Sequence, residues 1–384
     1  MIRKEKDIMF ITYTNNNGMI KPLINRVNKK GLNKYLRFED FIAHVNELLD
    51  VNANTPDSFM QRLDTMLTYL EKSLTQGIAY SNFTQGPKRN AIVNMRKQGD
   101  FHRNAKLVKD IINYYLNGQI QSCLKVIDDW FEYCCQHKGS FHGFLLLDTN
   151  KYYKIRVSEE KPITSAEAML HVPYEKRHLA NVGRYSVLGF PCVYLSKSIA
   201  CCWEELNHPV LNKTYVSAFQ PKEMLYFLFD LRLNRISFGS EYELIKYLEY
   251  LPIITACSFK VKYQEASFKP EYVIPQMILT SLIAERKLNV AYGIAFSSSK
   301  MRTIRENQAD DMCCVIPAFS PSESGTSEII KKMFKVTIPK CVGEEIQKHQ
   351  QWTIQEEGKL TRDSHIWKVL EEQLWDEEEF EIFA

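Results

Sequence analysis

The chain has 384 residues, 45% of them hydrophobic and 12% aromatic, which is enough for a sizeable core in one long domain or in two. Its 49 basic and 46 acidic residues give a net charge of +3, so no overall charge attracts it to nucleic acid or to an acidic membrane. The N-terminus lacks the apolar run of a signal peptide, and no apolar stretch approaches the ~18 residues of a membrane span. We therefore expect a soluble, cytoplasmic protein that contacts neither nucleic acid nor membrane directly.

Helical patterns fill the first part of the chain. Apolar residues recur at spacings of three and four over 59–74, and Thr55-Pro56 before them is typical of an N-cap followed by a first turn. A second helical run, LVKDIINYYL, ends at Asn117-Gly118, a pair suited to a left-handed C-cap. The sequence therefore predicts a mainly helical N-terminal domain over residues 1–145.

Short β-type runs separated by turn residues begin near Gly143 and include GFLLLD, KYYKIRVS, CVYLS, TYVSAFQ and LYFLFDL. Two helical stretches, SEYELIKYLEYL and PEYVIPQMILTSLIAERK, interrupt them before further strands follow. This pattern predicts an α+β catalytic-type domain over residues 146–345. Residues 346–384 have the pattern of a helical acidic tail that ends in a solvated run.

Cysteine and histidine are plentiful, but they lack the spacing of a zinc site. The ten cysteines occur singly or as adjacent pairs, with no C-x-x-C, and buried thiols explain them better than metal ligands do. The chain also lacks the phosphate-binding patterns G-x-x-x-x-G-K-[ST] and G-x-G-x-x-G and the nucleophile elbow G-x-S-x-G. We therefore expect no metal site and no P-loop, Rossmann or acyl-hydrolase chemistry.

One segment combines charged and aromatic side chains at fixed intervals. In VGRYSVLGFPCVYLSKSIACCWEEL, Tyr194 follows Arg184 by ten residues, and Glu205 follows Tyr194 by eleven. Further along, YGIAFSSS supplies Ser298. The order and spacing of these residues resemble the RES-domain family over roughly residues 150–340 of the chain.

Two positions of the motif have neighbours of the same type. Glu204 precedes Glu205, and Ser297 and Ser299 flank Ser298. Spacing favours Glu205 and Ser298. The chain departs from the family at Phe296, where a tyrosine is usual.

The resemblance implies a fold similar to that of ADP-ribosyltransferases and an enzyme that degrades NAD, usually as the toxin of a toxin–antitoxin or defence system. NAD is then a substrate, and no cofactor is needed. The acceptor stays open, because water would make the enzyme a glycohydrolase and phosphate would make it a phosphorylase. The family often pairs with a separate protein antitoxin, which we expect as a partner here.

The residue types suit this chemistry. A carboxylate beside the ribose stabilises the positive charge of an oxocarbenium-like transition state. A guanidinium matches diphosphate oxygens with a planar fork of donors, and an aromatic face stacks on the nicotinamide ring. A hydroxyl orients the ribose or the nicotinamide amide. The candidate residues are therefore catalytic Glu205, Arg184 and Ser298 and NAD-binding Arg156, Tyr185 and Tyr194.

Two competing functions fit the same residues. A protein ADP-ribosyltransferase would use the same pocket, and an inactive RES-like interaction module would keep only the fold. Single residues also have structural roles open to them: an ion pair for Arg184, a solvated helix carboxylate for Glu205, core packing for Tyr194 and a helix cap for Ser298. The helical N-terminal domain lies outside the resemblance, and we expect it to regulate, to sense a target or to form a homo-oligomer.

Overall fold

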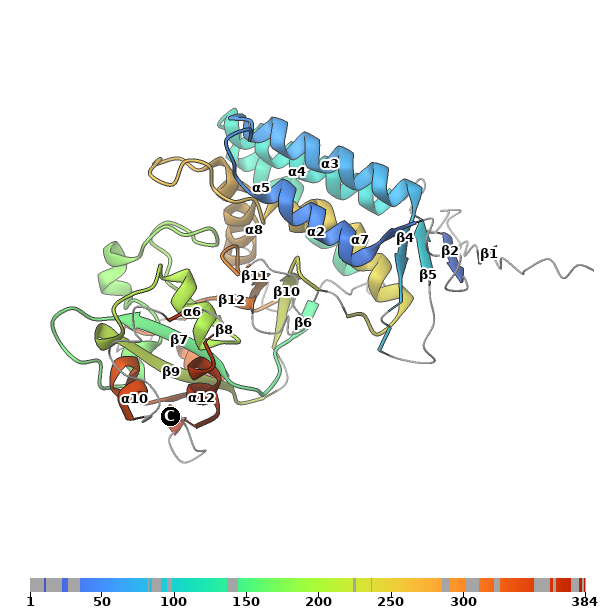
Figure 1. Ribbon diagram of the computed structural model, residues 1–384. Coiled ribbons are helices and arrows are strands. Elements are labelled where there is room, and N and C mark those ends of the chain that lie inside the picture. The colour runs from blue at the N-terminus through green and yellow to red at the C-terminus, as the bar shows by residue number, and fades with distance from the viewer. Residues whose placement is uncertain are drawn as a thin grey trace, which may run out of the picture. The chain divides into compact units, whose positions relative to one another are not determined.

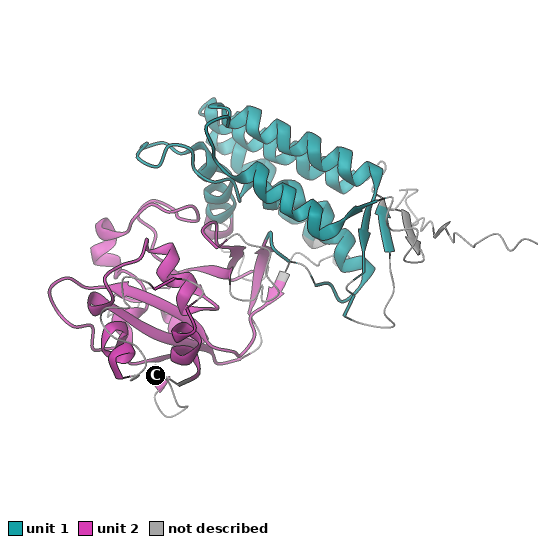
Figure 2. Ribbon diagram, in the orientation of Figure 1, with its two compact units in different colours: residues 1–143, 233–281 teal, residues 144–232, 282–384 magenta. Residues whose placement is uncertain are grey.

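The protein is described by a computed structural model, whose elements are labelled in Figure 1. The described residues are 10–11, 23–26, 35–81, 83–84, 91–94, 99–136, 144–223, 226–235, 237–284, 291–301, 311–320, 325–348, 360–361, 364–373, 380–381 and 383. The chain forms two compact units, shown in Figure 2. Unit 1 comprises residues 1–143 and 233–281, and unit 2 comprises residues 144–232 and 282–384.

Unit 1 combines a small sheet with long helices. Its five-stranded sheet has the order β1-β2-β5-β4-β3. The strands are β1 (Phe10–Ile11), β2 (Leu23–Arg26), β3 (Leu36–Arg37), β4 (Ile78–Tyr80) and β5 (Ala91–Asn94). The helices are α2 (Phe38–Leu49), α3 (Phe59–Gln76), α4 (Gly99–Leu116), α5 (Ile120–Gln136), α7 (Glu241–Ala256), η5 (Pro270–Tyr272) and most of α8 (Val273–Ala284).

Local capping sets the helix ends in unit 1. The N-cap of α3 is Ser58, whose hydroxyl accepts a hydrogen bond from the Gln61 N–H at 3.4 Å. The prediction of an N-cap at Thr55 is therefore wrong, because the Thr55 hydroxyl accepts the Asn52 N–H at 2.8 Å in the preceding turn. The C-terminal prediction for α4 is confirmed, since Gly118 follows the helix with a φ of 72°.

The segment 233–281 packs within unit 1, although the residues that precede it in the chain, 144–232, belong to unit 2. An aromatic cluster joins this segment to α2 and β4, and its members are Phe38, Tyr80, Phe238 and Tyr247. The ring centroids of Phe38 and Phe238 are 5.6 Å apart and meet edge to face. The Tyr80 hydroxyl accepts the Phe238 N–H at 3.1 Å, which fixes the backbone as well.

A buried ion pair also joins the segment 233–281 to the N-terminal helices, near the start of α3. The Arg62 guanidinium binds the Glu271 carboxylate, and the two side chains are 3% and 2% exposed. The predicted boundary at 145 lies beside the start of unit 2 at Phe144. The predicted domain over 146–345 is not continuous. Residues 233–281 make their contacts with the N-terminal helices and belong to unit 1.

Unit 2 is built on a ten-stranded sheet with the order β15-β13-β9-β7-β8-β12-β11-β10-β6, in which β14 pairs with β9 off this path. The strands are β6 (Phe144–Leu146), β7 (Tyr152–Val157), β8 (Cys192–Ser196), β9 (Thr214–Pro221), β10 (Phe227–Leu231), β11 (Gly293–Ser297), β12 (Met312–Pro317), β13 (Phe334–Thr337), β14 (Lys340–Cys341) and β15 (Phe380–Glu381). The helices are η2 (Glu167–Met169), η3 (Tyr174–Leu179), α6 (Ile199–Glu205), η4 (Leu211–Lys213), α9 (Glu328–Met333), α10 (Val342–Lys348) and α12 (Ile366–Gln373). The mixed helix and strand content agrees with the predicted α+β class.

Alternate residues of the central strands face two cores. Tyr153 of β7 packs in a core with α6, α10 and α12. Leu195 of β8 packs in a second core with the 166–170 segment and α9. Residues paired directly across strands share a face. The face toward α6, called the α6 face below, therefore carries Tyr153, Ser196, Cys313 and Phe296.

The C-terminal tail is partly built into unit 2. Of the predicted helical stretch 346–384, the structure describes α12, whose Trp367 and Leu370 are buried in the core under α6. Strand β15 then pairs with β13, with Glu381 opposite Val336. The tail therefore adds a helix and an edge strand to the unit. In the described part of the chain, every helix is too short or too polar to cross a membrane.

Candidate functional site

A carboxylate and a hydroxyl meet at the end of helix α6. Glu205 is the last residue of α6, and Ser298 directly follows β11. The Ser298 N–H donates to the Asp311 carbonyl at 2.8 Å, which extends the β11–β12 ladder to this residue. The fully buried Ser298 hydroxyl donates to Glu205 Oε1 and accepts the Lys300 and Met301 N–H groups at 3.2 and 3.3 Å. Its hydrogen-bonding capacity is thus used within the protein, once in holding the carboxylate and twice in holding the backbone that follows.

The residues adjacent in sequence have other contacts. The Glu204 carboxylate lies 3.0 Å from His208 Nε2. Ser297 pairs with Met312 in the β11–β12 ladder, so strand alternation places its side chain on the opposite face of the sheet from Ser298. Of the neighbours left open by spacing, the structure brings Glu205 and Ser298 together.

Lys300 fixes the helix end that carries Glu205. Its Nζ donates to the carbonyls of Glu204 and Glu205 at 3.0 and 2.7 Å and to Asn207 Oδ1 at 2.7 Å. A lysine at this end satisfies carbonyls that have no partner within the helix and complements the helix dipole. Lys300 was not among the residues predicted from the sequence, because its contacts join residues 95 positions apart. Its place two residues after Ser298 is the only local signal.

An aromatic group lies beside this pair on the α6 face. The Tyr185 ring, which is 1% exposed, packs on the Phe296 ring with centroids 4.5 Å apart. Phe296 and Ser298 are two residues apart on one strand, so they lie on the same face about 7 Å apart. The Tyr194 hydroxyl donates to the Tyr185 carbonyl, and the Tyr194 side chain is 39% exposed. Of the two tyrosines predicted to stack on a ligand ring, Tyr194 presents the accessible face.

Arg184 lies in the turn that precedes Tyr185. The Ser186 hydroxyl closes this turn by accepting the Gly183 N–H at 2.8 Å and donating to the Gly183 carbonyl at 3.0 Å. Arg184 is half-buried on the turn. It belongs to the loop that forms one wall of the cavity described next, but it is not one of the lining residues.

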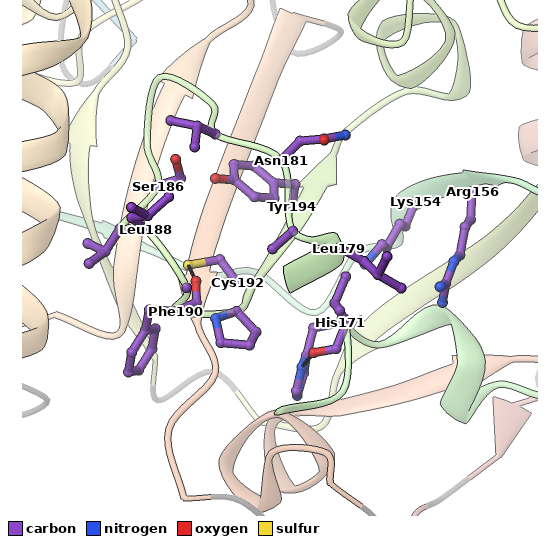
Figure 3. A pocket seen from close by; sticks show the side chains of 16 residues that line it. Lys154, Arg156, His171, Leu179, Asn181, Ser186, Leu188, Phe190, Cys192 and Tyr194 are labelled. Carbon is purple, nitrogen blue, oxygen red and sulfur yellow. Dashed lines mark hydrogen bonds between the residues drawn. The ribbon is translucent and has the colours of Figure 1, made fainter. Parts of the chain in front are cut away.

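A cavity of about 270 Å³ adjoins Tyr194 (Figure 3), slightly smaller than the ~300–1,000 Å³ of ordinary ligand pockets. Its lining comes from β7 (Lys154 and Arg156), β8 (Cys192 and Tyr194), His171, Val172 and the loop 179–191. The described ladder between β7 and β8 consists of one pair, Tyr153 with Ser196. Beyond that pair both strands contribute to the cavity, which therefore occupies the space where they separate.

The cavity has one permanent and one conditional cation. Burial, and next the positive charge of Arg156, lower the pKa of Lys154 to about 7. Burial also lowers the pKa of His171. The His171 ring lies 2.8 Å from the Val172 carbonyl through Nδ1 and accepts the Ser327 N–H at 2.9 Å through Nε2, which assigns the neutral ring with its proton on Nδ1. Lys154 was missed as a site residue, although it shares a strand face with Arg156.

The predicted residues all lie in unit 2, and four of them fall into two groups. Glu205 and Ser298 form the hydrogen-bonded pair, and Arg156 and Tyr194 line the cavity. Tyr185 connects the groups through its carbonyl and its ring.

The cysteines near α6 contact each other and the backbone. The Cys201 and Cys313 sulfurs are 3.4 Å apart, and the Cys202 thiol donates to the Tyr153 carbonyl at 3.2 Å. The hydrogen bond to Cys201, and then burial, raise the pKa of Cys313, and burial raises that of Cys202, so both thiols stay protonated. Across the described residues, no three His, Cys, Asp or Glu side chains gather as a metal site requires.

The chain is similar to a protein of Bacillus subtilis (strain 168) named "Putative toxin YopC", with 32% identity over 214 residues. The alignment covers 52% of this chain and 48% of that protein, so the chain spans about half the length of the curated relative it matches. No protein-family model and no solved structure matches the chain. Membership of the RES-domain family and the ADP-ribosyltransferase-like fold therefore stay predictions.

Proposed function

We propose that the chain is an NAD-cleaving enzyme that acts as a toxin. The observation that carries the proposal is the Glu205 carboxylate, held by a buried hydroxyl on the sheet face that also carries the Tyr185–Phe296 rings. The exposed Tyr194, whose hydroxyl donates to the Tyr185 carbonyl, also lines a cavity with two basic side chains. NAD combines the matching features: a cationic aromatic ring, a ribose and a diphosphate.

Cleavage breaks the bond between C1′ of the ribose and the nicotinamide nitrogen. The electron pair of this bond leaves with the ring, which becomes neutral nicotinamide, and the ribose becomes oxocarbenium-like. The Glu205 carboxylate stabilises that positive charge. Water then adds to C1′ and loses a proton to give ADP-ribose, and inorganic phosphate in its place would give ADP-ribose 1″-phosphate.

Ser298 acts in this proposal as a positioning residue. Its hydroxyl donates to the Glu205 carboxylate, and this hydrogen bond fixes the direction of the side chain. Lys300 holds the main chain of the same residue. The carboxylate is therefore fixed in place before the substrate arrives, which is the condition for electrostatic stabilisation of a transition state.

The toxin role rests on the name of the Bacillus subtilis relative. Loss of NAD would stop the metabolism of the cell that makes the protein, so we expect a separate protein that neutralises it. A protein ADP-ribosyltransferase and an inactive module are the competing functions.

The test is NAD consumption by the purified full chain, with and without inorganic phosphate, followed by chromatography of the products. We expect nicotinamide release that Glu205→Gln reduces about 100- to 1,000-fold, the usual loss when one charge-stabilising group is removed. Glu204→Gln is the matched control, because its carboxylate contacts His208 and not Ser298. It should retain most of the activity.

Three results would decide among the alternatives. Equal loss in both variants would mean that the helix end, and not the Glu205 carboxylate, is needed. Nicotinamide release only when a protein acceptor is added would favour the ADP-ribosyltransferase. Intact NAD under all conditions, with a folded protein, would favour the inactive module.

A further inference from the structure

Two cationic side chains open into the cavity from one strand. Lys154 and Arg156 are two residues apart on β7, lie on the same face and both line the cavity (Figure 3). Among the described residues of the lining, no aspartate or glutamate is present to balance them. The cavity wall thus carries positive charge without a counter-charge of its own.

The contacts of these two side chains are to neutral groups. The Lys154 ammonium donates to the Leu170 carbonyl, and the Arg156 guanidinium donates to the Ala168 carbonyl. Two other half-buried cations of unit 2 have a carboxylate as partner: Lys197 binds Asp148 at 2.5 Å and Arg232 binds Asp230 at 2.7 Å. A charge removed from water without a partner of opposite sign is costly, so the two cations that line the cavity favour an anion supplied from outside.

The rest of the cavity lining is mainly apolar. Three side chains of its loop wall are exposed large hydrophobics: Leu179, Val182 and Leu188, at 60%, 55% and 82%. A small inorganic anion would leave this surface unused. A nucleotide would place its diphosphate on the cations and cover the apolar side chains with its base or sugar.

We propose that Lys154 and Arg156 form the diphosphate subsite of a nucleotide-binding cavity, in which Lys154 takes up a proton when the ligand binds. This inference rests on the proposed function for the ligand class and adds a residue that the motif does not contain. Arg156 keeps its charge at all physiological pH values, whereas the charge on Lys154 depends on what occupies the cavity.

The groups that surround Lys154 set the direction of this change. They are Arg156 on its own strand, His171 after η2, Cys192 on β8 and Cys202 on α6. The arginine is a like charge, the histidine is neutral, and burial raises the pKa values of both thiols, so they too stay neutral. With the pKa of Lys154 at about 7, much of the side chain is neutral above that pH. A bound diphosphate stabilises the charged form and raises the pKa.

The experiment is isothermal titration calorimetry of the full chain with ADP-ribose at pH 6, 7 and 8, each in two buffers of different ionisation enthalpy. ADP-ribose is the suitable probe because its diphosphate keeps one charge state across this range. We expect uptake of about 0.9 proton per ligand at pH 8 and of almost none at pH 6. The affinity should fall about fivefold from pH 7 to pH 8, because only charged Lys154 binds well.

Two variants separate charge from structure. Lys154→Arg keeps a permanent cation, so it should bind with no proton uptake and with an affinity that does not change with pH. Lys154→Met removes the cation and should bind at least tenfold more weakly at pH 6, again without uptake. Lys213→Met is the matched control, because Lys213 is an exposed lysine of unit 2 that pairs with Glu159. Thermal melting verifies that each variant is folded.

The outcomes are distinct. Absence of proton uptake by the wild type at pH 8, or the same uptake by Lys154→Met, would overturn the inference, as would failure to bind ADP-ribose. Inorganic phosphate that binds as tightly as ADP-ribose would overturn the nucleotide assignment and point to a phosphate acceptor. Proton uptake at Lys154 together with intact NAD would support the subsite and reject NAD cleavage. NAD cleavage that needs Glu205, together with Lys154 variants that bind ADP-ribose like the wild type, would support NAD cleavage and reject the subsite.

Discussion

Unit 1 and the cavity of unit 2 treat charge in opposite ways. In unit 1, Arg62 binds Glu271 with both side chains almost inaccessible, and Lys246 binds Glu249 at 2.6 Å. These pairs join segments or turns that are packed against each other. They satisfy their charges within the protein and leave nothing for a ligand.

In the cavity of unit 2, the cations Lys154 and Arg156 contact backbone carbonyls. The carboxylate of Glu205 likewise accepts a serine hydroxyl, and the lysine near it binds carbonyls of the helix end. Charges of opposite sign that pair with each other cancel and hold a fold together. Charges held only by neutral groups are not cancelled, so they can still attract a charged ligand. We therefore expect the paired charges to be structural and the charges held by neutral groups to be functional, and each prediction below tests one side of this expectation.

The largest effect is expected from removing residues 1–145. The remaining chain keeps 233–281 but loses the partners of its buried groups. These include Phe38, which packs against Phe238, and Arg62, which pairs with Glu271. One buried charge without its partner already costs about 3–5 kcal/mol. We expect 146–384 to be insoluble or to unfold without a cooperative transition in urea.

A second deletion makes this test specific. Removing both parts of unit 1, residues 1–143 and 233–281, and joining Arg232 to Leu282 by a glycine–serine linker leaves the residues of unit 2 alone. We expect it to be the more soluble of the two truncated chains. Cooperative unfolding of 146–384 would show instead that 233–281 does not depend on the N-terminal helices.

The second prediction concerns the ion pair itself. Arg62→Met leaves the Glu271 carboxylate buried and unpaired, which should lower the free energy of unfolding by about 3–5 kcal/mol in urea titrations. The double variant Arg62→Met, Glu271→Leu should recover most of this loss, because it removes both charges. NAD cleavage per folded molecule should not change. A single-variant effect below about 1 kcal/mol would mean that the pair contributes little.

The third prediction concerns Lys300. Lys300→Met removes the donor that fixes the main chain of Glu205, and a small displacement of a catalytic group reduces turnover strongly, by about 10- to 100-fold here. KM should change little, because Lys300 does not line the cavity. Lys300→Arg should restore part of kcat, and Lys213→Met should leave it unchanged. A rise in KM with unchanged kcat would assign Lys300 to substrate binding.

Local patterns in the sequence predicted the local features of the fold. The left-handed C-cap at Gly118 and the strands of unit 2 follow from residue types within a few positions, because capping and alternation are short-range. The predicted N-cap at Thr55 was wrong because a second residue suited to capping, Ser58, follows three positions later. Its hydroxyl accepts an N–H of the helix. The position of 233–281 depends on contacts between distant segments, which no local pattern contains.

The candidate site divides in the same way. Motif spacing named Glu205 and Ser298, and the structure joins them across 93 residues. Spacing did not point to Lys300 or Lys154, because one acts through backbone carbonyls and the other through a cavity formed by separated strands. Whether these residues cleave NAD stays a prediction.

The smallest expected effect is the pH dependence of stability from Lys154. Its pKa falls from an ordinary 10.5 to about 7 in the folded chain, so between these values the unfolded state binds more protons. Stability attributable to this residue therefore rises with pH from about 7 toward 10.5, and the penalty of a buried charge is fully present below 7. Comparing the urea midpoints of the wild type and Lys154→Met from pH 6.5 to 9 should show the wild type gaining on the variant as pH increases. Saturating ADP-ribose should remove the difference in slope, because the ligand supplies the counter-charge. Parallel curves without ligand would mean that the charge of Lys154 is already compensated, and the contrast between unit 1 and the cavity of unit 2 would no longer hold.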